Sequence, residues 1–537
     1  MTKNSRLSIL LPILLTVVFA LGFFFGAKIF NSNGRNTFSN QTQNNGNKIN
    51  EIIQYIDDNY VDTVNHKKLI DISIASMLET LDPHSNYITA EELNSVNESL
   101  EGSFDGIGIE FNIQRDTIMV VSAIPGGPSE KMGILAGDRI VKIDNKKAAG
   151  VKITNDQVFK KLRGKAGTIV TISILRNGHS KLADYTIERD KIPSKSIDTY
   201  YMITNEIGFI KLNKFSLTSY DEFLEGVKSL MNQGMKKLIF DLRGNGGGYL
   251  NAAIDICDEF LPKNKLIVYT EGKSRPRKDY FATRKGILTD IKVLVLIDEF
   301  SASASEIVAG AIQDNDRGLI AGRRSFGKGL VQEQIEMADG SALRLTVARY
   351  HTPTGRCIQK PYGENISDYY DEFAKRFTDG ELKTADSIKF NDSLKYKTPA
   401  GNVVYGGGGI MPDKFISIDT VGTSMYLNQL AVQGVINQFA FNFVDKNREN
   451  IKKTYKNAAF FVANFNVTPA MFDELIKIAS VKGIEKNDKQ IATSQSIIKA
   501  QMKALIGRNL FGSEAFYPVI FKIDETYTKA IDLIKNM

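Results

Sequence analysis

The stretch that decides the fold runs from Ser301 to Gln332 and reads SASASEIVAGAIQDNDRGLIAGRRSFGKGLVQ. It follows a nearly unbroken apolar run at residues 292–297, which is typical of a strand buried on both faces of a parallel sheet. Apolar residues then recur at helical spacing over residues 304–312. Ser303 is therefore predicted where a strand ends and a helix begins, a place where unpaired helix N–H groups favour negative charge.

Ser303 and Lys328 together suggest a nucleophile and its base. A serine hydroxyl needs a base to take its proton, and a lysine can do so only when its amine is neutral. Burial in an apolar pocket disfavours the ammonium form and lowers the pKa of the amine. Gln332 follows Lys328 by four residues and could orient that amine without adding a charge.

Simpler interpretations of the same residues stay open at this point. Serine at the start of a helix is commonly an N-cap, and a single lysine is commonly a solvated surface charge. The segment Gly322–Gly329 reads G-x-x-x-x-G-K-G, one residue short of a phosphate-binding loop. Such a loop needs Ser or Thr after the lysine to hold Mg²⁺, and Gly329 has no hydroxyl group.

The run SASASE followed by FGKGLVQ resembles the carboxyl-terminal processing peptidases, also called tail-specific proteases. The resemblance implies Ser303 as nucleophile, Lys328 as general base and Gln332 as the residue that holds the lysine. It also implies an α/β serine-peptidase core of the crotonase or ClpP type. Some members have an aspartate at the position of Asp314, which we interpret as structural in this chain.

A glycine-rich segment at residues 243–248 follows a predicted strand at residues 237–242. By the same resemblance, the backbone N–H groups of Gly247 and Ala304 would form an oxyanion hole, which needs two fixed donors for the acyl-transfer intermediate. The family usually has Asn-Asn-Pro-Gly-Gly after the arginine, whereas this chain has Gly-Asn-Gly-Gly-Gly. Glycine in place of proline predicts a looser loop and leaves Gly248 as an alternative donor.

Residues 102–193 are similar to a PDZ domain. A short glycine-bearing strand resembles the carboxylate-binding loop, in which backbone N–H groups converge on a terminal carboxylate and the strand pairs with the incoming peptide. Residues 155–162 are predicted to form the helix that faces the groove. The expected peptide-binding residues are Gly106, Ile107, Gly108 and Ile109 of the loop and strand, and Val158 and Leu162 of the helix.

An uncharged apolar run, Leu7–Ala27, lies near the N-terminus. As a helix it would span ~32 Å, enough for a bilayer core of ~30 Å. Lys3 and Arg6 precede it, which predicts a cytoplasmic N-terminus with the rest of the chain outside. We expect an uncleaved anchor in the inner membrane of a bacterial cell envelope, with the catalytic domain on the periplasmic or extracytoplasmic side. A cleavable signal peptide is the alternative.

The composition indicates a multidomain globular protein. A chain of 537 residues is too long for one core. The net charge of +7 comes from 68 basic and 61 acidic residues without a dense basic cluster, so no nucleic-acid binding is expected. Two cysteines and four scattered histidines show no disulfide framework and no metal-ligand spacing. We therefore expect no metal and no cofactor.

Two further segments receive only structural roles. Ile52–Leu81 looks helical and ends in Leu-Asp-Pro-His-Ser, which resembles the end of the family's N-terminal helical region and which we interpret as a turn, His84 included. From about Thr423 the sequence is helical without recognisable chemistry, so packing or assembly into a homo-oligomer is its expected role. The predicted parts are a cytoplasmic N-terminus with a transmembrane anchor (1–28), a flexible linker (29–49), an N-terminal helical region (50–98), a PDZ domain (99–193), a Ser–Lys peptidase domain (194–422) and a helical C-terminal region (423–537).

The sequence thus predicts an α/β multidomain serine endopeptidase that binds the C-terminal tails of envelope proteins through its PDZ domain and cleaves them through an acyl-enzyme. One alternative is a catalytically silent scaffold that gathers envelope proteins, which the altered glycine loop would favour. A second alternative is a Ser–His–Asp triad that uses His351, but the chain has no G-x-S-G-G-like loop for its nucleophile.

Overall fold

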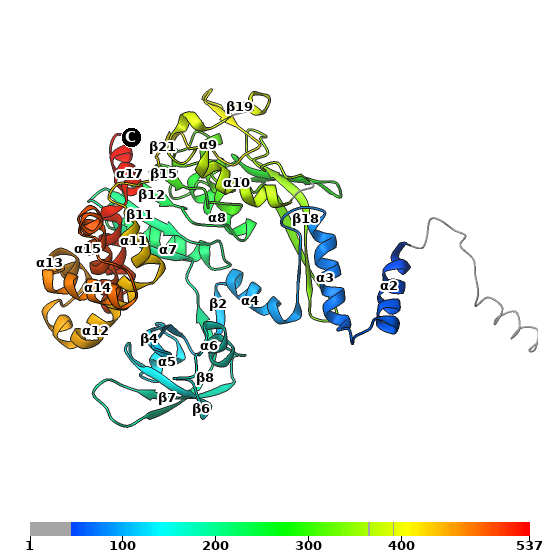
Figure 1. Cartoon of the computed structure of the whole chain (residues 1–537). Helices are drawn as coiled ribbons and strands as arrows, with labels where there is room; N and C mark the ends of the chain where they lie inside the picture. The colour runs from blue at the N-terminus through cyan, green and yellow to red at the C-terminus, as the bar shows by residue number, and fades with distance from the viewer. Residues whose placement is uncertain (1–44, 364–365, 390) are drawn as a thin grey trace, which may run out of the picture. The chain divides into compact units, whose positions relative to one another are not determined.

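The computed structural model describes residues 45–363, 366–389 and 391–537 (Figure 1). The chain falls into two compact units, which divide between Ile74 and Ala75. The predicted membrane segment, Leu7–Ala27, lies outside the described residues. Within them, no helix combines the length and the apolar character needed to cross a bilayer.

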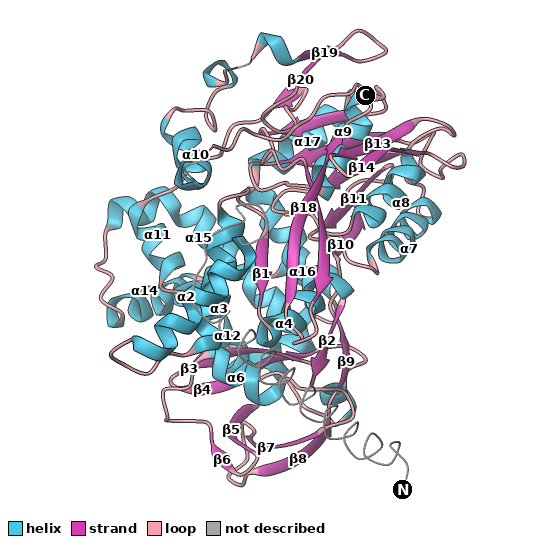
Figure 2. Ribbon diagram, turned by 90° about the vertical axis from the view of Figure 1, so that its right-hand side faces the viewer, coloured by secondary structure: helices cyan, strands magenta, loops and turns pink. Residues whose placement is uncertain are grey.

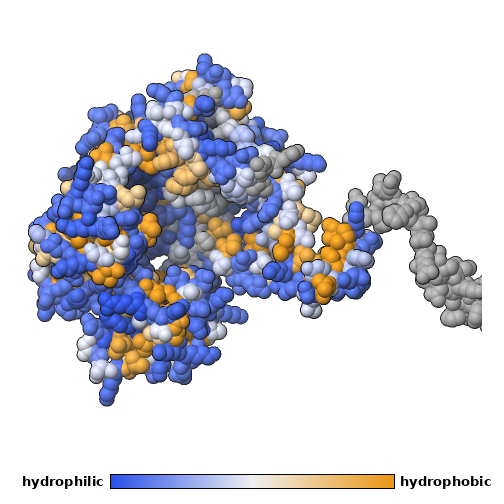
Figure 3. All heavy atoms as spheres, viewed as in Figure 1, coloured by the Kyte–Doolittle hydropathy of each residue, from blue (hydrophilic) through white to orange (hydrophobic). Residues whose placement is uncertain are grey.

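Two helices, α2 (Asn45–Asn59) and α3 (His66–Glu79), begin the described chain. The prediction of continuous helix over Ile52–Leu81 is therefore wrong at residues 60–65, where the chain leaves the helical conformation. Asn65 starts the second helix, because its side-chain Oδ1 accepts a hydrogen bond from the Lys68 N–H at 3.0 Å. Helix α2 exposes apolar side chains, and its surface shows orange in Figure 3.

Residues 103–193 form a small β domain with its own core, as the resemblance to a PDZ domain implies. Its elements are β2 (Ser103–Gly106), β3 (Ile109–Gln114), β4 (Thr117–Ala123), α5 (Pro128–Lys131), β5 (Arg139–Ile143), β6 (Lys146–Lys147), α6 (Asn155–Leu162), β7 (Ile169–Leu175), β8 (Ala183–Glu188) and β9 (Asp190–Pro193). The main sheet has the order β3-β4-β5-β7-β8, with β6 on β5, and β2 pairs with β9. Among the described strands β3 pairs only with β4, so its other edge is open.

A six-stranded sheet forms the centre of the predicted peptidase domain, in the order β10-β11-β12-β15-β16-β21. Its strands are β10 (Ile197–Met202), β11 (Ile207–Leu212), β12 (Lys237–Asp241), β15 (Lys292–Ile297), β16 (Leu319–Gly322) and β21 (Lys414–Phe415). All but β10 run parallel to their neighbours. Since both faces of a parallel sheet are covered, β12 and β15 are almost entirely buried and apolar, as predicted.

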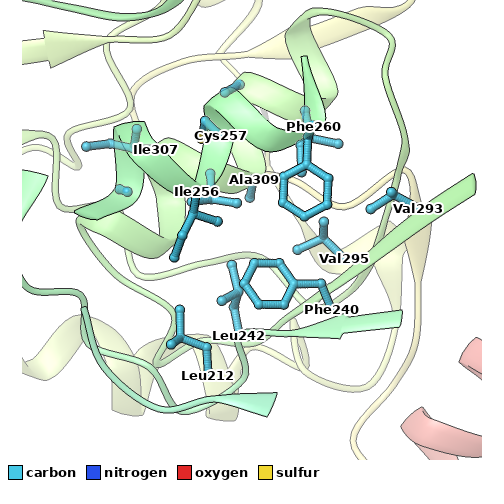
Figure 4. Close-up of a cluster of buried hydrophobic side chains, with 14 of the residues drawn as sticks. Leu212, Phe240, Leu242, Ile256, Cys257, Phe260, Val293, Val295, Ile307 and Ala309 are labelled. Carbon is cyan, nitrogen blue, oxygen red and sulfur yellow. The ribbon is translucent and has the colours of Figure 1, made fainter. Parts of the chain in front are cut away.

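Helices cover both faces of this sheet. Those that take part are α7 (Ser219–Asn232), α8 (Leu250–Phe260) and α9 (Ala304–Asp314) on one face, and α17 (Glu525–Lys535) on the other. On the first face, Phe240 and Val295 share a core with Phe260 of α8 (Figure 4). On the second face, Phe209 packs with its ring 5.3 Å from that of Tyr527. The second face of the sheet is therefore covered by α17, which is distant from β11 in the sequence.

A second sheet has the order β1-β18-β13-β14, with β17 paired to β18 (Figure 2). Its strands are β1 (Asn86–Ile88), β13 (Leu266–Gly272), β14 (Arg275–Phe281), β17 (Leu330–Glu336) and β18 (Ala342–His351). Asn86 pairs with Arg344 of β18, and Gln332 of β17 pairs with Thr346 of β18. Strand β18 therefore lies between β1 and β17. It connects the turn before β1 to the segment that follows Lys328.

The remaining elements are mostly helices, as predicted for the C-terminal region. They are α4 (Ala90–Glu101), α10 (Ile366–Thr378), η1 (Ala385–Ser387), η2 (Asp392–Leu394), β19 (Lys395–Lys397), β20 (Val403–Tyr405), α11 (Met425–Val432), α12 (Val435–Thr454), α13 (Ala458–Asn464), α14 (Pro469–Val481), α15 (Asp488–Phe511), α16 (Ser513–Ile520) and η3 (Phe521–Ile523). Helices α11 to α15 share a core that includes Phe439 and Phe461. Phe521, by contrast, belongs to the core of the six-stranded sheet.

Candidate active site

Ser303 lies at the N-terminus of α9, after the loop that leaves β15, which is where the sequence predicts it. Its φ of 55° and ψ of −113° are values that a non-glycine residue adopts only under local strain. The backbone N–H of Ser303 donates to Glu306 Oε2 at 2.8 Å, which helps to hold this conformation. A strained turn from strand to helix presents the hydroxyl at the edge of a sheet, and here Ser303 lines a cavity.

The other two serines of the SASAS run point into the protein. Ser301 Oγ donates to the Leu242 carbonyl at 2.9 Å, and Ser305 Oγ donates to the Asn245 carbonyl at 2.8 Å. Both side chains are fully buried, whereas Ser303 is partly exposed. Of the three serines, only Ser303 lines this cavity.

Lys328 lies in the glycine-flanked segment between β16 and β17. Gly329 is required there, because a Cβ atom at this position would lie 2.9 Å from the backbone nitrogen of Gln359. The Lys328 Nζ donates to Gln332 Oε1 at 3.0 Å. Lys328 and Ser303 line the same cavity of about 440 Å³, although no hydrogen bond joins Nζ to the Ser303 Oγ in the described part of the chain.

The surroundings of Lys328 disfavour its charged form. Burial is the largest cause that lowers the pKa of Lys328, and the guanidinium group of Arg344 lowers it further. The carboxylates of Asp82 and Glu306 act in the opposite direction. Because its hydrogen-bond acceptor Gln332 is uncharged, the amine gains no direct ion pair there to retain its proton.

Gln332 is held by the turn Asp82–Ser85, a contact that the sequence did not indicate. Its Nε2 donates to the His84 carbonyl at 2.5 Å, which leaves Oε1 to face Lys328. An amide group has one donor end and one acceptor end. The carbonyl of His84 therefore determines which end of Gln332 is presented to the lysine.

Hydrogen bonds fix this turn to strand β18. Asp82 Oδ1 accepts from the backbone N–H groups of His84 and Ser85, each at 2.8 Å, and from the Thr346 hydroxyl at 3.1 Å. Ser85 Oγ accepts from the Thr346 N–H at 3.0 Å. Although burial opposes the charged carboxylate, the hydrogen bonds from Ser85, His84 and Thr346 lower the pKa of Asp82.

The His84 side chain contacts Tyr369 of α10. Its Nε2 lies 2.7 Å from the Tyr369 hydroxyl of α10, and the two rings meet edge to face. Burial, followed by the charge of Lys328, lowers the pKa of His84 to about 4. The imidazole ring is therefore neutral around pH 7 and adds no charge beside the lysine.

Glu306 joins the serine loop to the lysine loop. Its Oε2 accepts from the backbone N–H groups of Ser303 at 2.8 Å and Lys328 at 2.9 Å, and its Oε1 accepts from Gly327 N–H at 2.7 Å and Ser325 Oγ at 2.6 Å. The carboxyl group is fully buried, and burial raises the pKa of Glu306 to about 7 in spite of these donors. One side chain thus fixes the backbone at both residues of the predicted dyad.

The glycine-rich loop after β12 lies beside Ser303, because a Cβ atom at Gly247 would lie 2.8 Å from the Ser303 Cβ and 3.0 Å from the Ala304 nitrogen. The backbone N–H of Gly247 donates to Asn245 Oδ1 at 2.9 Å, so this donor already has a partner. Gly246 and Gly248 line the cavity together with Ser303 and Ala304. A Cβ atom at Gly248 would lie 2.0 Å from the Phe215 carbonyl oxygen, so only glycine fits. Gly247 and Gly248 both stay candidates for the donor beside Ala304.

Comparisons with known proteins identify the family of the chain. A model of peptidase family S41 matches residues 206–366, and a PDZ-domain model matches residues 106–187. A model of the N-terminal domain of the activating protease CtpB matches residues 17–92, and one of a family of unknown function matches residues 426–512. The chain is 39% identical over 355 residues to the carboxy-terminal-processing protease of Bartonella bacilliformis, a match that covers 64% of this chain and 80% of that protein.

The chain belongs to the carboxy-terminal-processing protease family. It is also 35% identical over 353 residues to a probable CtpA-like serine protease of Staphylococcus aureus, with 65% of this chain and 68% of that protein covered. Among solved structures, the photosystem II D1 C-terminal processing protease is 25% identical, with 68% of this chain and 92% of that chain covered and a TM-score of 0.36. As a member of this family, the protein is a serine-type peptidase with a PDZ domain.

The PDZ domain of this family member contains the predicted loop, strand and helix. The Ile107 carbonyl accepts from the Ser129 N–H at 3.0 Å, and the φ of 73° at Gly108 requires glycine. The helix residues Val158 and Leu162 are buried in the core of the domain.

Two aromatic side chains, Phe111 of β3 and Phe159 of α6, contact each other. Phe159 of α6 is 43% exposed, and its ring centroid is 5.3 Å from that of Phe111 on β3. These residues were not predicted to line the groove. The alternation of side chains along β3 could have indicated Phe111, which is two residues after Ile109 and shares its face.

Two residues that could compete for a catalytic role lie elsewhere. Asp314 forms an ion pair of 2.6 Å with Arg356, and both side chains are fully buried, which fits the structural interpretation of this aspartate. His351 stacks on Tyr269 with ring centroids 4.6 Å apart and does not line the cavity that contains Ser303. His351 is therefore not placed to act as a base for Ser303.

Proposed function

We propose that this family member is a Ser–Lys endopeptidase in which Ser303 is the nucleophile, Lys328 the general base and Gln332 the residue that orients the lysine. The observation that carries this proposal is the shared cavity: Ser303 and Lys328 both line it, and the acceptor of the Lys328 amine is an uncharged amide. The lowered pKa of Lys328 supports a neutral amine.

In the proposed reaction, Ser303 Oγ attacks the carbonyl carbon of the scissile peptide bond while its proton passes to Lys328 Nζ. The negative charge on the carbonyl oxygen would be stabilised by the backbone N–H groups of Ala304 and of Gly248, or Gly247 as the family resemblance implies. Loss of one such donor typically costs ~3–4 kcal/mol of transition-state stabilisation. Lys328 then returns the proton to the leaving amine, and water hydrolyses the acyl-enzyme.

The proposed substrates are C-terminal tails of cell-envelope proteins. The relative from Bartonella bacilliformis is named a carboxy-terminal-processing protease, and the PDZ domain offers the open edge of β3 to an extended peptide. The uncharged run Leu7–Ala27 after Lys3 and Arg6 supports an anchor in the inner membrane with the catalytic domain outside the cytoplasm. Protease accessibility in spheroplasts tests this orientation, and protection of the catalytic domain would contradict it.

Substitution of the dyad tests the proposed chemistry. Ser303→Ala and Lys328→Met should each lower kcat/KM for an unstructured peptide with an apolar C-terminus by roughly a thousandfold or more. Ser305→Ala is the matched control, because the Asn245 carbonyl that it contacts also accepts from the Ala302 N–H at 3.0 Å. Retained hydrolysis by either dyad variant would reject the mechanism.

A serine-directed fluorophosphonate probe separates the protease from the silent scaffold. The probe should label Ser303 in the wild-type chain and in Ser305→Ala, and should fail to label Ser303→Ala. Peptide binding without labelling or turnover would instead support a scaffold that gathers envelope proteins through its PDZ domain.

A further inference from the structure

We propose that Arg344 forms a carboxylate-binding subsite in the catalytic cavity and favours substrates that carry an acidic side chain close to the scissile bond. This inference rests on the proposed function, because it adds a substrate preference to the same cavity. It concerns the peptide beside Ser303 and is separate from capture of a C-terminus by the PDZ domain.

The charge of the cavity carries the first part of the argument. Two basic side chains, Lys328 and Arg344, line it, and no acidic side chain does so among the described residues. Once Lys328 is neutral, as a general base must be, Arg344 is the remaining fixed charge of the lining. A recess lined by charge of one sign attracts groups of the opposite sign.

Other cavities of this protein show how unusual that lining is. The cavity beside β16 and β21 contains Asp290, Asp316 and Asp413 together with basic residues. Two more cavities, which include residues of the C-terminal helices, also combine acidic and basic side chains. The catalytic cavity differs from these three because its positive charge is not balanced by an acid in its lining.

The contacts of Arg344 carry the second part. Its Nη2 donates to Gln334 Oε1 at 2.8 Å, and Gln334 is held in turn by Asn97 Oδ1 at 3.1 Å from its Nε2. Neutral side chains therefore position the guanidinium group without neutralising it. No ion pair of Arg344 is found among the described residues, although the side chain is partly buried.

Two other arginines of the same domain form ion pairs with carboxylates. Arg356 donates to Asp314 at 2.6 Å and Arg323 to Glu299 at 2.6 Å. A guanidinium group has five N–H donors and matches a carboxylate with two parallel hydrogen bonds. Arg344 uses one such donor on Gln334, so it retains donors for a ligand.

A substrate carboxylate would supply the missing partner. A charge-assisted hydrogen bond to a partly desolvated cation is worth roughly ten- to a hundredfold in affinity. A glutamine of the same shape offers only a neutral oxygen. The preference for glutamate over glutamine at one position of the peptide is therefore the quantity that reports on Arg344.

The experiment measures this preference in binding, without turnover. Fluorescent peptides would carry a single Glu or Gln at each of three positions on either side of the scissile bond, and an amidated C-terminus so that no terminal carboxylate competes. In the full chain carrying Ser303→Ala, we expect Glu to bind about tenfold or more tightly than Gln at one position at least. Adding Arg344→Gln should bring that ratio to about one.

Two further variants keep the test decisive. Arg344→Lys keeps a positive charge but loses the two-donor geometry, so an intermediate ratio is expected. Arg349→Gln removes a charge from the same strand at an exposed residue that does not line the cavity, so the ratio should stay at the value of the Ser303→Ala parent. Melting temperatures of all variants would identify any that fails to fold.

Equal binding of Glu and Gln peptides at every position in the Ser303→Ala parent would overturn the proposal. A preference that persists unchanged in the Arg344→Gln variant would also overturn it. Either result is distinct from failure of the proposed function, which is measured by hydrolysis in chains that retain Ser303, because the binding ratio does not depend on the chemical step.

Discussion

The two sides of the catalytic cavity are fixed in different ways. On the serine side, Ser303 is held by Glu306, three residues further along the same helix. On the lysine side, Gln332 depends on the carbonyl of His84, which is 248 positions away in the sequence. The predicted nucleophile, in a turn from strand to helix, is thus specified locally, whereas the orientation of its predicted base depends on tertiary pairing between β1 and β18.

The largest effect is expected where the two sides meet, at Glu306. Each of its carboxyl oxygens accepts two donors, so Glu306→Gln would force an amide NH₂ group against two of them. We expect the free energy of unfolding to fall by about 2–3 kcal/mol and kcat/KM to fall at least a hundredfold or so. Urea denaturation and peptide hydrolysis measure these changes.

Ser325→Ala is the comparison for Glu306→Gln, because it leaves the carboxyl group in place while removing one of the four donors and the acceptor of the Ile410 N–H. Its loss of kcat/KM should be smaller than that of Glu306→Gln, because it forces no donor against another. If Glu306→Gln left both stability and hydrolysis unchanged, the carboxyl group would not join the two loops as the hydrogen bonds indicate.

The next prediction concerns a charge introduced beside Lys328. Gln332→Glu would place a carboxylate where Oε1 lies 3.0 Å from Lys328 Nζ, and an opposite charge raises the pKa of an amine. Since the base must be neutral, the rising limb of the pH profile of kcat/KM should move to higher pH. At pH 7.5 we expect at least a tenfold loss or so, with recovery toward pH 9–10.

Gln332→Met controls for the loss of the amide without adding a charge. It should lower kcat at all pH values and leave the rising limb close to its wild-type position. A limb that does not move in Gln332→Glu would show that Lys328 is not the group that titrates in the reaction.

The smallest effect tests the remote turn that holds Gln332. Asp82→Asn weakens the hydrogen bonds that fix the turn to Thr346, so kcat should fall roughly tenfold while KM changes little. His84→Ala keeps the backbone carbonyl that Gln332 contacts and loses the side-chain contacts with Tyr369 and Phe326. Its kcat should therefore fall less than that of Asp82→Asn.

Steady-state kinetics of both variants, together with their melting temperatures, measure this difference. A larger loss of kcat in His84→Ala than in Asp82→Asn would mean that the imidazole ring, and not the backbone of the turn, supports the lysine.

Much of the fold could be predicted because it follows local patterns. The apolar run of β15, the helical spacing of α9 and the order of glycine and apolar segments in the PDZ domain are all contiguous in the sequence. The same holds for Ser303, whose position between a strand and a helix is confirmed. The buried strand β12 is predicted on the same basis.

The parts that could not be predicted depend on contacts between distant residues. Strand β1 has three residues, too few for an alternating pattern, so its pairing with β18 leaves no signal in the sequence. The turn before it therefore received only a structural role, although its carbonyl orients Gln332. The hydrogen bond from the Gly247 N–H to Asn245 Oδ1 depends on the folded loop, which composition cannot reveal.

Helix α17 has a consequence for how the protein is made. It covers the second face of the six-stranded sheet, more than 200 residues after Phe209 of β11, against which it packs. During translation, that apolar face stays uncovered until residues 525–535 have left the ribosome. The peptidase core can therefore reach its native form only after the segment that matches the family of unknown function has been synthesised, which delays proteolytic competence relative to emergence of Ser303.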